Sequence, residues 1–401
     1  MPLSQQDLEF YFDKIFPAKQ FYNWLSYGDE SYFQKREFSF TLAGDIYLRF
    51  RSFEDANELQ KDLVRKKPEK IDIGGVYNVQ PKMKDSVSVF QAREKELVFD
   101  IDISDYDDVR VCCQDKSICD RCWPLMSCAL QILDRILKED FGFKHLMYVF
   151  SGRRGVHCWT CDKNARKLTD EERTALASYI NVYEGGEAQK INIEYNLKMG
   201  NLHPSLESVY KDFIKPGFRD MFLSDKLNAE NSLHQEKTAN NIMKMVARHV
   251  KGFGKEHEMK LNKALTQGDK SCEDRWRAVS KLCAEWEKTA KDKLWVPKYI
   301  EFLYMYPRLD VNVSKQCNHL LKAPFVIHPG TGNVCLPLSL EEALHFEPSA
   351  NPKLQQVLGD YGNGVLTLEP YLENFQVFID GCRIDAEQVS MDVDGTATTT
   401  A

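Results

Sequence analysis

The chain has 401 residues, of which 43% are hydrophobic and 28% charged, with only 15 prolines and 21 glycines. This composition is globular and excludes a collagen-like, linker-like or largely disordered chain. The formal net charge is -7, which argues against a free-standing protein that holds duplex nucleic acid by phosphate neutralisation alone. No run of apolar residues approaches the ~18 needed for a membrane span. We therefore expect a cytosolic or nuclear protein without membrane contact.

The first hundred residues predict helices followed by strands. Residues 4–27 are rich in aromatic side chains and are interrupted by Pro17, which indicates two short helices. Residues 37–53 alternate apolar and polar side chains about a Gly-Asp pair, as in a β-hairpin. Further strands are expected at 70–77 and 96–103.

The middle of the chain predicts one more helix and two more strands before a long helical region. Apolar residues recur at helical spacing over 125–137, and short apolar strands follow at 146–150 and 156–160. Strands on either side of a helix indicate an α/β or α+β layer rather than an all-β barrel. From residue 169 to about 293 the pattern is mostly helical and lysine-rich, so we expect an inserted helical subdomain.

Two aspartates in the strand 98–103 carry the strongest chemical signal. Successive side chains of a strand face opposite sides, so Asp100 and Asp102 share one face while Phe99 and Ile101 point into a core. Two carboxylates on one wall can share a pair of hard divalent cations. A solvated edge strand is the alternative that the pattern leaves open.

A similar pattern occurs at residues 308–312, where sheet character returns before a further sheet-rich stretch over 325–338. A strand here would place Arg308, Asp310 and Asn312 on one face. If this strand lies beside the first, three carboxylates meet, which suits two-metal phosphoryl or nucleotidyl transfer.

A glycine- and arginine-rich turn at residues 151–157 separates the two apolar strands. Its glycines allow a ligand to approach the backbone, and its two arginines with a histidine offer donors that suit a triphosphate. The turn lacks the Lys-Ser/Thr of a Walker A loop. An exposed basic hairpin tip is the alternative. Lys322 and His328 are further cationic candidates that follow the Asp310 strand.

Four of the twelve cysteines fall within eleven residues and end in a CxxC pair: Cys112, Cys113, Cys119 and Cys122. Four thiolates that close on Zn²⁺ would fasten a loop of low apolar content. A second CxxC pair, Cys158 and Cys161, lies in a predicted strand, and we interpret it as core thiols.

These motifs occur in an order typical of one family. The blocks are Arg36-Glu37-Phe38-Ser39-Phe40, Lys70-Ile71-Asp72-Ile73-Gly74, Phe99-Asp100-Ile101-Asp102, Tyr106-Asp107-Asp108-Val109-Arg110, Ser151-Gly152-Arg153-Arg154-Gly155-Val156-His157 and Pro307-Arg308-Leu309-Asp310-Val311-Asn312. In these blocks the chain resembles the catalytic small subunits of eukaryotic DNA primases, in the archaeo-eukaryotic primase superfamily.

The resemblance implies a fold and a domain division. The fold class is a mixed-sheet α/β (α+β) catalytic core, the prim fold, with an inserted helical subdomain and a zinc-binding element. The implied units are the N-terminal part of the core (1–180, with the zinc element at 112–122), the helical subdomain (181–300), the C-terminal part of the core (301–383) and a disordered tail (384–401).

The resemblance also implies roles for individual residues. Asp100, Asp102 and Asp310 match the catalytic metal-binding triad, and Cys112, Cys113, Cys119 and Cys122 would be the zinc ligands. The matching nucleotide-binding positions are Ser151, Arg153, Arg154, His157, Asn312, Lys322 and His328, with Glu37, Arg49, Lys70 and Asp72 around the nucleotide and the initiating 5′ end.

The implied activity is DNA-directed RNA primer synthesis in the nucleus, on a single-stranded DNA template and from NTPs. The implied cofactors are two catalytic Mg²⁺ or Mn²⁺ ions and one structural Zn²⁺. The implied partners are the large primase subunit, an iron-sulfur protein, and DNA polymerase α with its accessory subunit. Two alternatives remain: a primase-polymerase of the same superfamily that prefers dNTPs, and a non-catalytic replisome scaffold held by zinc.

Overall fold

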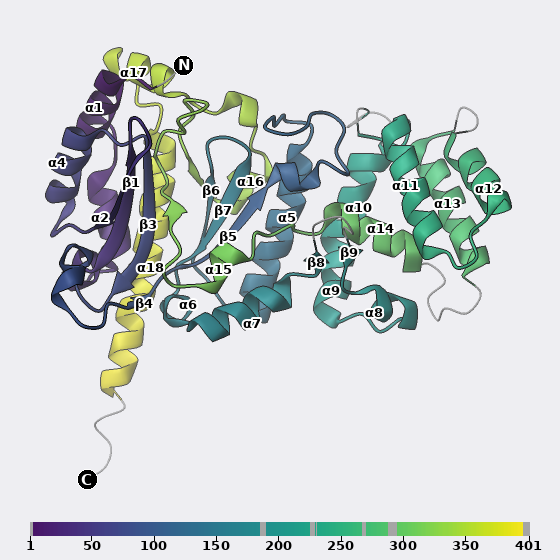
Figure 1. The fold of residues 1–401 in the computed structure, drawn as a ribbon, viewed down its shortest axis with the longest axis horizontal. Helices are drawn as coiled ribbons and strands as arrows, with labels where there is room; N and C mark the ends of the chain where they lie inside the picture. The colour runs from purple at the N-terminus through teal and green to yellow at the C-terminus, as the bar shows by residue number, and fades with distance from the viewer. Residues whose placement is uncertain are drawn as a thin grey trace, which may run out of the picture.

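The computed structural model describes residues 3–184, 190–224, 229, 231–266, 270–287 and 295–395, with side chains described up to residue 383. Figure 1 shows two adjacent β-sheets flanked by helices and, on the far side of the second sheet, a lobe built of helices. Of the helices in these ranges, none combines the length and the apolar character that a bilayer crossing requires.

The first sheet is antiparallel, with strand order β10-β3-β1-β2 and β4 paired to β3. Its strands are β1 (Arg36–Leu42), β2 (Ile46–Arg51), β3 (Lys70–Tyr77), β4 (Ala92–Glu94) and β10 (Leu321–Lys322). The helices α1 (Gln5–Lys14), α2 (Ala18–Ser26) and α4 (Ala56–Lys66) cover one face, with α3 (Glu30–Gln34) before β1 and a 3-10 helix (Pro81–Ser86) before β4. The predicted helix pair and hairpin are therefore confirmed.

The second sheet is also antiparallel, in the order β11-β6-β7-β5. Its strands are β5 (Leu97–Asp102), β6 (Leu146–Phe150), β7 (Gly155–Thr160) and β11 (Pro337–Leu338). The amphipathic α5 (Trp123–Arg135) packs on it and runs into a π-helical turn (Ile136–Asp140), as the helical spacing predicts. The core thiols Cys158 and Cys161 are buried, also as predicted.

Shorter helices border the two sheets: a 3-10 turn (Ile103–Tyr106), α6 (Lys163–Lys167), α7 (Asp170–Ile180), α15 (Asn312–Lys315), α16 (Leu340–Leu344), a 3-10 turn (Pro348–Ala350) and α17 (Leu354–Gly362). Thr169 and Glu172 form the predicted capping box of α7. The long helix α18 (Glu369–Gly395) lies against α2 and β11, and its Phe375 contacts the rings of Phe21 and Trp24.

The helical lobe begins after a short hairpin of β8 (Tyr183–Glu184) and β9 (Lys190–Ile191), which the sequence did not predict. Its helices are α8 (Glu194–Met199), α9 (Pro204–Val209), a π-helical turn (Tyr210–Ile214), α10 (Lys215–Phe218), a second π-helical turn (Arg219–Leu223), α11 (Glu236–His249), α12 (Lys255–Thr266), α13 (Cys272–Trp286) and α14 (Trp295–Met305). The stretch after residue 169 is thus mostly helical, as its pattern predicts, and its helices form a lobe beside the second sheet (Figure 1).

Two predictions need correction. The expected strand over 308–313 is reduced to one bridge between Leu309 and Ile101, and α15 begins at Asn312 because the Asp310 carboxylate accepts its backbone N–H. The second correction concerns the tail, which we expected to be disordered from residue 384. Over 384–395 the backbone instead continues α18, because adding residues to a helix that has already formed costs little free energy. Residues 396–401 of that tail lie outside the described residues.

Candidate active site

The paired aspartates of β5 lie on one face, as their spacing predicts. Their neighbours Phe99 and Ile101 are each 1% exposed, whereas the carboxylates of Asp100 and Asp102 are 29% and 31% exposed. The antiparallel register sets Asp100 opposite His157 of β7, whose Nε2 lies 3.6 Å from an Asp100 carboxylate oxygen. Both carboxylates therefore stand at a partly open edge of an otherwise buried strand.

Asp310 joins this edge from the other end of the chain. Its backbone N–H donates to the carbonyl of Asp100 at 3.0 Å, next to the bridge that pairs Leu309 with Ile101. Burial, together with the negative charges of Asp102 and Asp310, raises the pKa of Asp100 to about 7, against a smaller opposing effect of Lys322. Three crowded carboxylates of this kind suit hard divalent cations, which take oxygen ligands and cancel the repulsion.

The second β5 carboxylate is held by two groups. Arg154 Nε donates to Asp102 Oδ2 at 2.6 Å, and the backbone and hydroxyl of Ser104 both donate to Asp102 Oδ1 at 2.8 Å. Arg154 therefore lies over the carboxylates, and the turn that carries it faces them. Arg153 makes no hydrogen bond or ion pair with any residue that the structure describes, so its guanidinium is available to an anion.

The turn between β6 and β7 is tightly constrained. Gly152 has φ +82°, and a Cβ there would lie 2.7 Å from His328 Cβ. Ser151 Oγ accepts the N–H of Gly155 at 3.0 Å, while Lys322 Nζ donates to the Ser151 carbonyl at 3.3 Å. The structure thus brings the predicted turn, Lys322 and His328 together.

Both histidines of the site are held neutral. Burial and the nearby Lys322 ammonium together lower the pKa of His157 to about 3. Burial, with the charges of Lys322 and Arg153, lowers the pKa of His328 to about 4. Near pH 7 the positive charge of the site therefore resides on Lys322, Arg153 and Arg154, and the two imidazoles act as neutral hydrogen-bonding groups.

The candidates on the first sheet fall into two groups. Asp72 pairs with Lys322 in the β3–β10 ladder and accepts from Ser39 Oγ at 3.0 Å, so it adjoins the main site with Lys70 nearby. Burial raises the pKa of Asp72, partly offset by these neighbours.

Glu37 and Arg49 form the second group, further along the sheet. Glu37 is fully buried and accepts from Arg49 Nε at 2.9 Å and from the Tyr77 hydroxyl at 3.0 Å. The Leu320 side chain packs toward both Gly74 and Glu37, since a Cβ on Gly74 would lie 2.9 Å from Leu320 Cδ2 and 3.0 Å from Glu37 Cβ. Asn312 contributes its backbone N–H to Asp310 at 3.1 Å, and its side chain is exposed.

The four cysteines form one cluster with their sulfur atoms all within 4.8 Å of one another. The distances from Cys113 Sγ to Cys119 and Cys122 are 3.6 and 3.7 Å, and Cys119 and Cys122 are 3.9 Å apart. A tetrahedron of Zn–S bonds of about 2.3 Å has edges of about 3.8 Å, so these thiols fit a zinc ion.

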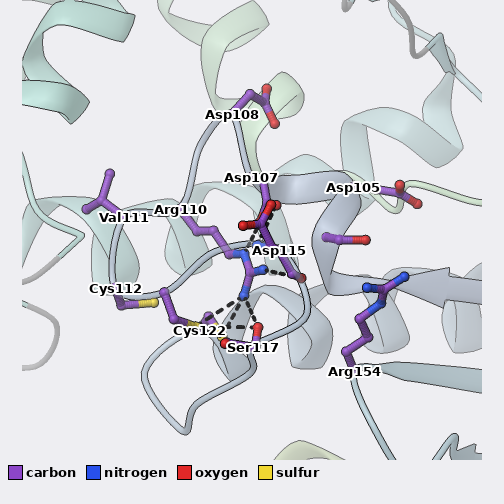
Figure 2. A network of polar contacts seen from close by, with 12 residues as sticks. Asp105, Asp107, Asp108, Arg110, Val111, Cys112, Asp115, Ser117, Cys122 and Arg154 are labelled. Carbon is purple, nitrogen blue, oxygen red and sulfur yellow. Dashed lines mark hydrogen bonds and ion pairs between the residues drawn. The ribbon is translucent and has the colours of Figure 1, made fainter. Parts of the chain in front are cut away.

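The Arg110 side chain lies beside the cysteine cluster and makes hydrogen bonds to the loop that carries it (Figure 2). Its guanidinium donates to Cys113 Sγ at 3.2 Å, to the Ser117 carbonyl at 2.9 Å and to Asp107 Oδ1 at 2.6 Å. The side chain is fully buried. A cation in this position stabilises thiolates and fixes the loop that carries them.

Sequence reasoning assigned no role to several residues of the segment between β5 and the cysteines. Burial, together with the charge of Asp102, raises the pKa of Asp105 to about 6, so a fourth carboxylate borders the triad. Arg308 pairs with Asp108 and also donates to the carbonyls of Asp105 and Leu303. The block 106–110 is part of the family resemblance, and its density of acidic residues close to the β5 carboxylates was the available signal in the sequence.

Comparisons with known proteins agree on one family. A model of the DNA primase small subunit family matches residues 99–340. The chain is 35% identical to the DNA primase small subunit of Caenorhabditis elegans, over 94% of this chain and 97% of that protein. It is 39% identical to that of Drosophila melanogaster (88% and 81%) and 34% identical to that of Saccharomyces cerevisiae (94% and 91%).

A solved polymerase domain of Mycobacterium tuberculosis ligase D in complex with DNA is also similar, with a TM-score of 0.41, 10% identity and 92% of each chain covered. This likeness is too loose to support an argument. The stretch matched by the family model contains the three carboxylates, the Arg153-Arg154 turn and the cysteine cluster.

Proposed function

Since this chain belongs to the DNA primase small subunit family, whose members are catalytic nucleotidyltransferases, we propose that it synthesises short RNA primers on single-stranded DNA for replication. The substrates are NTPs, and the growing 3′-hydroxyl attacks the α-phosphate of the incoming NTP and expels pyrophosphate. The reaction needs precise positioning and charge neutralisation more than it needs covalent chemistry from the protein.

One observation carries the proposal: Asp310 is hydrogen-bonded to the backbone of Asp100, although more than two hundred residues separate them. With Asp102 they form an acidic cluster whose repulsion a pair of cations would relieve. Two Mg²⁺ or Mn²⁺ ions bound there would lower the pKa of the attacking hydroxyl and stabilise the leaving pyrophosphate.

The cationic groups around the triad support triphosphate binding in this proposal. Arg153 and Lys322 hold the phosphates because, within the part of the chain that the structure describes, Arg153 has no partner and the Lys322 ammonium donates to the carbonyl of Ser151 alone. Arg154, bound to Asp102, orients that carboxylate and reaches the phosphates. Ser151, His157, His328 and Asn312 complete the wall as neutral donors and acceptors, with Lys70, Asp72, Glu37 and Arg49 toward the initiating end.

The proposal also assigns a structural ion, a subdomain and partner subunits to this chain. The cysteine cluster holds one structural Zn²⁺, and the helical lobe is a subdomain inserted into the catalytic core. The chain works in the nucleus with an iron-sulfur large subunit and with DNA polymerase α and its accessory subunit. The net charge of -7 supports this sharing of the template, because an acidic chain holds a polyanion more firmly when a partner supplies further phosphate contacts.

The decisive experiment replaces the two β5 carboxylates. Asp100→Asn with Asp102→Asn should reduce ATP incorporation on poly(dT) with Mg²⁺ or Mn²⁺ on the order of a thousand-fold or more. Thermal stability should stay equal or rise, because repelling charges are removed. The matched control is Asp85→Asn, an exposed aspartate of the 3-10 helix before β4.

The same assay separates the alternatives. Undiminished synthesis by the double variant would refute the proposal and favour a scaffold. Incorporation of dNTPs by the unaltered chain at a rate equal to or above that of NTPs would favour a primase-polymerase instead.

A further inference from the structure

A groove of about 620 Å³ lies beside the first sheet and borders the candidate site at Arg49, which is one of its lining residues. Its walls come from β2, from the segment that ends in β4, from the turn between α6 and α7, and from the segment after α15. Aromatic and cationic side chains line it together, and that combination is typical of surfaces that bind single-stranded nucleic acid.

The aromatic part of the groove is a pre-formed stack. The Phe90 ring lies flat on the buried Tyr77 ring, with centroids 4.1 Å apart and planes at 4°, and the Phe50 ring stands edge-on to Phe90 at 5.7 Å. Phe90 itself is half-buried. A base can extend this stack because every nucleobase has a flat π-face.

Phe50, whose ring is part of this aromatic stack, has an unusual backbone conformation. Its φ is +58°, in the left-handed region that disfavours side chains, and its N–H donates to Glu37 at 3.2 Å. Lys84 Nζ lies 4.1 Å from the centre of the Phe50 ring, which adds a cation at the rim of the stack.

Two free cations stand on opposite sides of the groove. Arg93 of β4 and Lys167 at the end of α6 are exposed, and neither makes a hydrogen bond or ion pair with any residue in the described ranges. The groove also contains two carboxylates. That of Asp170 accepts the backbone N–H of Cys317 at 2.9 Å, and that of Glu171 is exposed. The charge of Arg49 is balanced by Glu37, so Arg93, Lys167 and the nearby Lys84 stand against these two carboxylates in a chain that is acidic overall.

The groove and the candidate active site share two structural elements, strand β3 and the segment after α15. Cys317 lines the groove, and its backbone packs against β3 at Gly75. A Cβ added to Gly75 would lie 2.4 Å from the carbonyl oxygen of Cys317. Five residues later the same segment pairs Lys322 with Asp72. Tyr77 in the groove is five strand positions from Asp72, about 17 Å along β3, which a few unpaired nucleotides can span.

From this arrangement we infer that the groove binds unpaired bases of the DNA template strand as it leads to the catalytic carboxylates. A base stacks on Phe90, and Arg93 and Lys167 contact the flanking phosphates. The inference rests on the proposed function, since it names where that reaction holds its template.

The first test removes the two free cations without touching the candidate active site. Arg93→Gln with Lys167→Gln should weaken binding of fluorescent oligo(dT) to the full chain, measured by anisotropy across a salt series. The slope of log K against log salt should become shallower by about 1.4, since each phosphate contact on a single strand contributes ~0.7. The control is Lys19→Gln with Lys61→Gln, two exposed lysines on the helices behind the sheet.

The second test concerns stacking. Phe90→Leu should weaken oligo(dT) binding roughly 5- to 100-fold, whereas Phe90→Tyr, which keeps the ring, should bind like the unaltered chain. In synthesis assays Phe90→Leu should raise the KM for template and leave the KM for NTP and kcat within about two-fold. A general packing defect would instead lower kcat and thermal stability together.

Unchanged affinity and salt slope in the Gln pair, or an effect equal to that of the control pair, would overturn the inference. An increase in the KM for NTP with no change for template would also overturn it, and would place a nucleotide rather than template in the groove. Anisotropy needs no catalysis, so these outcomes stay distinguishable from a failure of primer synthesis itself.

Discussion

Gly152 fixes the turn that faces the three carboxylates. It combines a φ of +82° with contact on two sides, because a Cβ would lie 2.7 Å from His328 Cβ and 3.0 Å from Cys335 Sγ. Only glycine satisfies both constraints. The position of Arg153 and Arg154 relative to Asp102 therefore depends on the absence of a single methyl group.

We predict that Gly152→Ala destabilises the chain by roughly 2–5 kcal/mol, from left-handed backbone strain and overpacking together. It should also raise the KM for NTP, because the turn must shift away from Lys322 and His328. The control is Gly28→Ala, where φ is +85° and nothing lies within 4 Å of the added Cβ, so strain alone should cost about 1–2 kcal/mol. Urea unfolding and steady-state kinetics measure both effects, and equal losses in the two variants would contradict the steric argument.

At the scale of elements, the antiparallel hairpins were predictable and the approach of Asp310 was only partly so. The alternation over β5 reflects one buried face at Phe99 and Ile101, which a sequence displays directly, whereas β1 and β7 are buried along nearly their whole length. The segment 308–312 also alternates, but Arg308 turns inward to Asp108 and Asn312 starts a helix. A buried ion pair with a distant partner overrides local periodicity, and no local pattern reveals that partner.

The Arg308–Asp108 pair holds the Asp310 segment against β5. Arg308 is 1% exposed, and it also donates to the carbonyls of Leu303 and Asp105. We predict that Arg308→Met costs about 3 kcal/mol or more in unfolding free energy, because it leaves the carboxylate of Asp108 without its counter-charge. Synthesis should fall as well, since Asp310 follows two residues later.

A double-mutant cycle with Asp108→Asn tests the pair. The second substitution removes the orphaned charge, so the double variant should be less destabilised than the sum of the two single variants. Additive losses would mean that the two side chains do not act together.

At the scale of the whole molecule, the sequence offers candidate site residues but not their arrangement. Motif spacing and family resemblance point to the carboxylates, the turn and the cysteines as candidates, because each is a local pattern. The contacts that join them span long separations, such as the backbone bond between Asp310 and Asp100 and the pairing of Lys322 with Asp72. The aromatic groove was not predicted at all, since Phe50, Phe90 and Lys167 come from three separate segments.

The cysteine loop, residues 108–122, connects the sheets to the helical lobe through hydrogen bonds. Asn231 Oδ1 accepts the backbone N–H groups of Val111 and Cys112 at 2.7 and 3.1 Å, and Asn241 of α11 donates to the carbonyl of Asp108 at 2.7 Å. Lys237 of α11 reaches the Arg110 carbonyl at 3.4 Å. The cysteine cluster therefore lies in a loop that the helical lobe contacts directly.

We predict that zinc removal loosens this contact and leaves the sheets intact. Metal analysis should first find about one zinc per chain, because one set of four thiols fits one tetrahedral ion. After chelation, hydrogen exchange should accelerate in residues 108–122 and in α11, since both lose their shared hydrogen bonds, while β1 and β3 keep their protection. Cys119→Ser with Cys122→Ser should give the same exchange pattern without chelator, and Lys116→Met, an exposed cation of the same loop, should not. Uniform acceleration across both sheets would show instead that the metal supports the whole fold, and unchanged exchange in α11 would show that the lobe docks independently of the cysteine loop.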